Sequence, residues 1–152
     1  KRIDHEGALT VASADNNFVR NITFTDVEVD NLMEGNFITV KNYCSGYAAS
    51  DYANTKANKC GYMINNVTFN NVNWGGKYKN KNNVNSWIDI QGTKTSSSNT
   101  CSKNNEDHVV SLIKFNNVTI GDTKLSNSNK SSKYSDTIIY KSNSCVYNQT
   151  IN

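Results

Sequence analysis

The chain has 152 residues, a length typical of one domain, and a formal net charge of only +3. Its charges are dispersed and no apolar run is long enough to span a bilayer, so we expect neither a nucleic-acid partner nor a membrane partner. Apolar residues make up 36% of the chain, which is low for a compact globule, and proline is absent.

Short strands are predicted throughout, because β-branched and aromatic residues alternate with polar ones and Asn, Asp and Gly mark the turns. Helical periodicity is not sustained over a dozen residues anywhere. In chain order, strands are expected at Ala8–Val11, Val19–Val29 and Phe37–Lys41, and further strand pairs within Tyr62–Gly92 and Val109–Lys141. Polar insertions are expected at Tyr43–Gly61, Thr93–Asp107 and Leu125–Ser135. The sequence therefore predicts an all-β protein.

The strand that contains Phe24 recurs twice along the chain. The equivalent residues are Phe69, 45 positions further on, and Phe115, another 46 positions on. A nearly fixed period with one apolar template is typical of a solenoid, in which repeats bury their apolar faces against one another. We expect one domain of three to four coils with long loop insertions.

The shorter strand recurs too, as Leu9–Val11, Ile38–Lys41, Ile88–Gln91 and Ile138–Lys141. Strand alternation places one set of its residues inside and the other set outside. The outer set is Thr10, Thr39, Lys41, Asp89, Gln91, Ile139 and Lys141. With a basic and an acidic residue in register, this face is a candidate groove for a chain-like ligand, and the alternative is an ordinary solvated face.

The four cysteines occur in loop-like segments without a CxxC pair, which argues against zinc, and the sequence suggests no metal or cofactor. The simplest pairing joins Cys44 to Cys60 and Cys101 to Cys145, although four cysteines allow three patterns. Asn-x-Ser/Thr sequons occur at Asn21, Asn66, Asn117, Asn129 and Asn148. Together these features favour a secreted, extracellular protein. For the first three sequons, the alternative is that Asn-x-Thr belongs to the repeat and carries no glycan.

Three segments in order resemble the C-terminal half of the polygalacturonase family of glycoside hydrolases. They are HEGALTVAS from His5, VRNITFTDVEVDN from Val19, and GNFITVK ending at Lys41. The resemblance covers about two-thirds of the chain and implies a right-handed parallel β-helix that acts on pectin. It implies that His5 lies beside the catalytic acids and that Lys41 holds the substrate carboxylate. Thr39 replaces the arginine of the family's RIK motif, and Glu6 interrupts its GHG motif.

The family's paired aspartates precede the histidine, and this chain has no such segment. Inverting hydrolysis needs one carboxylic acid and a second carboxylate. The first hypothesis is therefore the C-terminal part of a secreted hydrolase for galacturonan-like glycans, with a second polypeptide or a lost segment supplying the aspartates and further N-terminal coils. Lys41, Lys141, Thr39, Asp89 and Gln91 would bind the substrate. The second hypothesis is a non-catalytic module that binds glycan or a partner protein.

Overall fold

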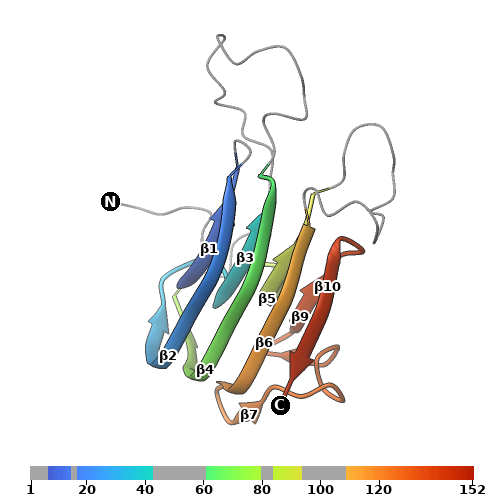
Figure 1. Ribbon diagram of the computed structural model, residues 1–152. Helices are drawn as coiled ribbons and strands as arrows, with labels where there is room; N and C mark the ends of the chain where they lie inside the picture. The colour runs from blue at the N-terminus through green and yellow to red at the C-terminus, as the bar shows by residue number, and fades with distance from the viewer. Residues whose placement is uncertain (1–6, 15–16, 43–60, 80–83, 94–108) are drawn as a thin grey trace.

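The computed structural model describes residues 7–14, 17–42, 61–79, 84–93 and 109–152. Its strands form two sheets that face each other (Figure 1). The long-strand sheet has the order β10-β6-β4-β2, and β7 pairs with β6. The short-strand sheet has the order β1-β3-β5-β9-β8. Apart from β7 and β8, consecutive strands along the chain alternate between the two sheets.

The strand bounds show how the two sheets differ. The long-strand sheet contains β2 (Phe18–Leu32), β4 (Met63–Tyr78), β6 (Val109–Ile120), β7 (Thr123–Lys124) and β10 (Val146–Ile151). The short-strand sheet contains β1 (Leu9–Ser13), β3 (Ile38–Asn42), β5 (Ser86–Gln91), β8 (Lys133–Tyr134) and β9 (Thr137–Ser142).

The all-β prediction is confirmed, but the prediction of a single right-handed parallel β-helix of three to four coils is wrong. The strands form two mixed sheets, each with four parallel strands and one antiparallel strand. The sequence repeats do specify parallel neighbours. The polar stretch around Gly121–Ser135 instead reverses the chain, so that β7 runs antiparallel to β6 and β8 antiparallel to β9.

The repeat alignment gives the correct register in most of both sheets. Phe24 pairs with Phe69, and Phe69 pairs with Phe115. The alignment is wrong between β5 and β9, where Ile88 pairs with Tyr140 and not with Ile138. The observed pairing differs from the alignment by two residues. The adjacent residues Ile138 and Ile139 have similar side chains, so the sequence of β9 fits either register.

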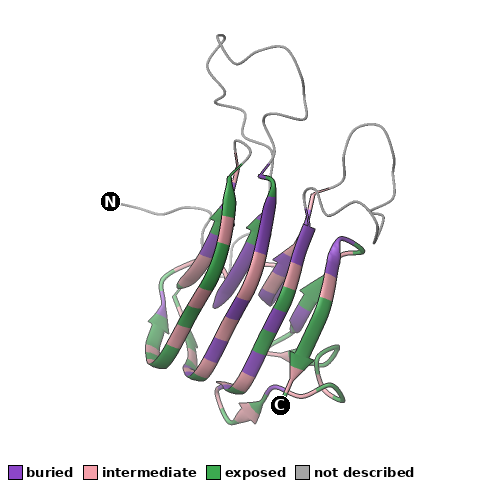
Figure 2. Cartoon of the chain, viewed as in Figure 1, coloured by how far each residue is buried: buried purple, intermediate pink, exposed green. Residues whose placement is uncertain are grey.

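Apolar side chains between the sheets form the core. Phe24, Phe69 and Phe115 stack with ring centroids 5.1 and 5.2 Å apart. Trp74 of β4 packs against Trp87 of β5, with centroids 4.6 Å apart, and both are fully buried. Their indole nitrogens donate hydrogen bonds to the carbonyls of Lys77 (3.1 Å) and Tyr134 (2.9 Å), so burial leaves neither indole N–H unpaired. Figure 2 shows the banding of buried and exposed residues along the long strands.

Two bends recur in the long strands, each at a residue with positive φ. The first bend is at Asn21, Asn66, Leu112 and Asn148, with φ between 54° and 59°. The second is at Asp26, Asn71 and Asn117, with φ between 50° and 56°. Asn and Asp tolerate this left-handed region better than other residues with a side chain. The Asn-rich composition thus has a structural cause: the strands need residues that bend the chain at fixed positions.

Hydrogen bonds between stacked asparagines connect these bends across the sheet. The side-chain nitrogen of Asn66 donates to Asn21 (2.8 Å), and Asn117 donates to Asn71 (2.9 Å), which donates to Asp26 (2.9 Å). A parallel row beside the second bend runs from Asn152 through Asn116 to Asn70. We call these rows asparagine ladders. In each of them, the later strand donates to the earlier one.

Candidate functional site

Four polar residues form a row on the outer face of the short-strand sheet, which we call the polar row: Lys41, Asp89, Gln91 and Lys141. Lys41 of β3 is in register with Gln91 of β5, and Asp89 of β5 with Lys141 of β9. Neighbouring strands are about 4.8 Å apart, so these side chains are adjacent. Both lysines are exposed, while Asp89 and Gln91 are partly buried.

Within the polar row, the Gln91 amide nitrogen donates to both carboxylate oxygens of Asp89, at 2.8 and 2.7 Å. This contact fixes the carboxylate beside the register position of Lys141. Lys41 and Lys141 are two strands and two residues apart, which places their backbones about 12 Å from each other. The row therefore offers two separated cations on either side of a held carboxylate and amide.

The other predicted members of this face do not join the polar row. Thr39 is buried, with an exposed fraction of 8%, and its hydroxyl has no hydrogen-bond partner among the described residues. The backbone at Gly7 covers it, since a Cβ on Gly7 would lie 2.9 Å from Thr39 Oγ1. Thr10 is occupied by the same turn, because its hydroxyl contacts the Gly7 amide nitrogen and carbonyl. Ile139 is buried, so its predicted place on the solvated face is wrong.

His5, the predicted catalytic residue, lies outside the described residues. So do Cys44, Cys60 and Cys101, and the two predicted pairings remain predictions. Cys145 is buried and disulfide-bonded.

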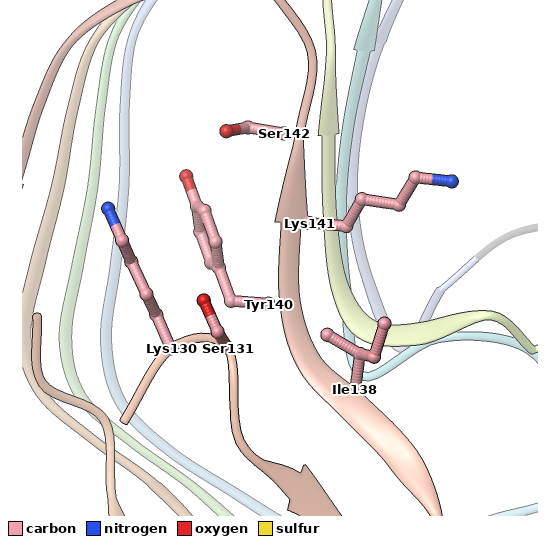
Figure 3. Close-up of a pocket in the computed structure, with 6 residues that line it drawn as sticks. All are labelled: Lys130, Ser131, Ile138, Tyr140, Lys141 and Ser142. Atoms are coloured by element: carbon pink, nitrogen blue, oxygen red, sulfur yellow. The ribbon is translucent and has the colours of Figure 1, made fainter. Parts of the chain in front are cut away.

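A pocket that the sequence did not indicate opens where the space between the sheets ends, beside β9. Its volume is about 360 Å³. In Figure 3, Tyr140 and Ser142 point from β9 into the space between the sheets beside Lys130, whereas Lys141 points the opposite way. The lining residues are Lys130, Ser131, Ile138, Tyr140, Lys141 and Ser142.

Tyr140 is the group in this pocket with a perturbed pKa. Burial raises the pKa of its phenol from 10.0 to about 12, and the nearby Asp89 carboxylate acts in the same direction. The neighbouring Ser142 side chain acts on the pKa in the opposite direction, but the buried hydroxyl does not lie in hydrogen-bond geometry with any described residue. Tyr140 therefore stays neutral at physiological pH and serves as apolar packing against Phe115, with centroids 5.8 Å apart.

The sequon asparagines differ in what their side chains already do. The amide nitrogens of Asn66 and Asn117 donate within the asparagine ladders, and that of Asn129 donates to the Lys124 carbonyl. Asn21 and Asn148 are exposed, and no described residue accepts a bond from either amide nitrogen. The geometry favours a structural role for Asn66 and Asn117 and leaves Asn21 and Asn148 as the accessible acceptors.

Trp74 and Trp87 are buried, so neither ring is available to a ligand at the surface. Tyr62 is exposed and packs edge-on against Phe18, with centroids 6.1 Å apart.

No group of three or more metal-ligating side chains occurs among the described residues. The described part of the chain also contains no helix long and apolar enough to cross a membrane. Comparison of the chain with family models, curated proteins and solved structures gives no match.

Proposed function

We propose that this chain binds an acidic, galacturonan-like polysaccharide along the polar row, in an extracellular setting. The observation that carries the proposal is the register of Lys41 with Gln91 and of Asp89 with Lys141. Two lysines at a fixed separation suit the repeated carboxylates of an acidic sugar chain. The Asp89 carboxylate and the Gln91 amide between them can bond to sugar hydroxyls.

Two further features support the extracellular setting. Cys145 is disulfide-bonded, and disulfides persist mainly in oxidising compartments. Asn21 and Asn148 are exposed sequon asparagines. Proline-free strands with polar, Asn-rich outer faces suit a surface that stays solvated until a hydrophilic polymer binds.

Hydrolysis is the second candidate and rests on the likeness of the His5–Lys41 segment to polygalacturonases. Asp89 is the sole carboxylate in β1, β3, β5 and β9. Inverting hydrolysis requires two carboxyl groups roughly 6.5–9.5 Å apart. A catalytic role would therefore need a further carboxylate from outside these strands, and we expect the chain alone to bind the polymer without cutting it.

Equilibrium binding of oligogalacturonate to lysine variants tests the proposal. We expect Lys41→Gln and Lys141→Gln each to weaken binding about threefold to tenfold, because each removes one charge-assisted contact. Raising the salt concentration should weaken binding of the natural chain in the same way. Lys114→Gln, the same charge change on an exposed position of β6, is the matched control and should change little. Equal losses in all three variants, or no binding at all, would refute the polar row as the site.

A further inference from the structure

The edge formed by β1 and β2 differs from every other part of the core. Each sheet ends there, since β1 and β2 are the terminal strands in the two strand orders. Val11 and Leu32 of these strands are buried, but six other apolar residues are only partly buried, whereas their partners in β3 and β4 are buried. They are Leu9, Val19, Ile22, Phe24, Val27 and Val29.

The opposite end of the two sheets is closed by the chain itself. β8 pairs along β9, and β7 continues the long-strand sheet beside β6. Leu125 is buried beneath this end, as is Ile139. Within the described part of the chain, no comparable covering lies over β1 and β2, so one face of the Phe24 ring lacks the stacking partner that Phe69 and Phe115 provide for each other.

Two of the asparagine ladders also stop at β2, with a definite polarity. Asn21 accepts from Asn66, and its own amide nitrogen donates to no described residue. Asp26 accepts from Asn71 and, as a carboxylate, has no proton to donate. The next strand would therefore offer an acceptor opposite Asn21 and a donor or cation opposite Asp26.

The bends in β2 decide what kind of strand can pair there. Positive φ at Asn21 and Asp26 interrupts the straight strand twice, and β4 matches both bends in parallel register, at Asn66 and Asn71. A second copy that paired antiparallel through its own β2 could bring the bends together only by setting Asn21 opposite Asp26. That register sets Phe24 opposite Thr23, so the inward-facing side chains of the two copies would lie on opposite faces of the joined sheet. The β10 strand of a second copy would match only the first bend, since it spans Val146–Ile151.

We propose that the β1/β2 edge docks a polypeptide segment that pairs parallel to β2 and repeats its bent-strand pattern. This segment carries asparagine or aspartate at the first bend, an apolar or aromatic residue over Phe24, and lysine, arginine or asparagine at the second bend. The partner is thus a separate polypeptide that supplies a strand of the same template as β4. The inference does not depend on the polysaccharide proposal, because the polar row is on the outer face of the other sheet.

Amide hydrogen exchange of β2 tests this inference. The probe is a synthetic peptide with the sequence of β4 carrying Asn71→Lys, added to the intact protein. At about millimolar peptide, we expect exchange at the outward amides of β2 to slow by about tenfold or more, with no change at β10. A control peptide with Asn66→Val and Asn71→Val should protect far less, since valine resists positive φ.

Protein variants distinguish a specific contact between Asp26 and the peptide lysine from nonspecific association. Asp26→Asn keeps the bend and the ladder acceptor but removes the charge, so it should weaken binding of the lysine peptide by about threefold. Asp122→Asn makes the same charge change in a turn near β7 and should have no effect. Three outcomes would overturn the inference: no protection of β2, equal protection by the valine peptide, or concentration-dependent self-association through β2 without peptide.

Discussion

At Leu112 the backbone adopts a φ of 55°, although the side chain is a leucine that is 40% exposed. The equivalent residues in β4 and β10 are Asn66 and Asn148. A leucine in this conformation carries a strain of about 1–2 kcal/mol, and it also interrupts the asparagine ladder. Leu112 is thus a local weak point of the long-strand sheet.

We expect Leu112→Asn to raise the free energy of unfolding by about 1–2 kcal/mol, because it relieves the strain and supplies a ladder residue between Asn66 and Asn148. Thermal unfolding should show a midpoint about 3–8 °C higher. Leu112→Ala is the control, since alanine keeps the strained φ and adds no hydrogen bond. If the alanine variant gains as much stability as the asparagine variant, the ladder explanation is wrong.

From the raised pKa of Tyr140 we expect the protein to lose stability at alkaline pH. Its pKa is raised from 10.0 to about 12 by burial, so the folded state keeps the phenol protonated while the unfolded chain ionises first. The contribution of the protonated phenol to the free energy of unfolding is fully present below pH 10 and is lost as the pH rises through 12. The loss amounts to about 3 kcal/mol at most.

Urea unfolding of the natural chain and Tyr140→Phe at pH 8, 10 and 12 measures this loss. The phenylalanine variant should be at least as stable as the natural chain at pH 8, because it removes a buried hydroxyl without a hydrogen-bond partner, and should lose less stability by pH 12. If the free energies of unfolding of the two proteins change equally with pH across this range, Tyr140 does not titrate as its burial requires.

At the scale of the strands, the asparagine ladders account for the register of the long-strand sheet. Asn71 is the central residue of one ladder, since it donates to Asp26 and accepts from Asn117. Asn71 also has a φ of 50°, a conformation that asparagine tolerates. The residue therefore contributes both the bend and the two hydrogen bonds.

Asn71→Ala should lower the free energy of unfolding by about 2–4 kcal/mol, because it breaks two hydrogen bonds and strains the bend. Asn71→Gly removes the same bonds but permits the bend, so it should cost about 1–2 kcal/mol less than alanine. Chemical denaturation of both variants separates the two contributions. Equal losses would mean that the bend itself is not under strain.

The sequence predicted these strands well where the apolar template and the asparagines agree, as at Phe24, Phe69 and Phe115. It failed between β5 and β9, because Ile138 and Ile139 carry no feature that distinguishes two registers. It also treated Leu125–Ser135 as a polar insertion, although Leu125 is buried and Lys133–Tyr134 forms β8. Periodicity reports which residues alternate, but pairing in a mixed sheet depends on turns that bring distant segments together.

At the scale of the whole molecule, the two sheets divide the surface by chemistry. The long-strand sheet displays stacked asparagines, the short-strand sheet displays the polar row, and the β1/β2 edge exposes apolar side chains. The polar row could be predicted from sequence for Lys41, Asp89, Gln91 and Lys141, because strand alternation fixes their common face. The burial of Thr39 could not, since it depends on where the backbone at Gly7 passes. The pocket beside β9 was missed because Lys130 and Tyr140 come from segments with no shared pattern.

The location of polysaccharide binding is the most direct test of the functional account. We would record backbone amide chemical shifts of isotope-labelled protein while adding oligogalacturonate. The account predicts that the largest shifts occur at Lys41, Asp89, Gln91 and Lys141, with little change in the long-strand sheet. Shifts confined to the pocket beside β9 or to the asparagine ladders, or an unchanged spectrum, would contradict it.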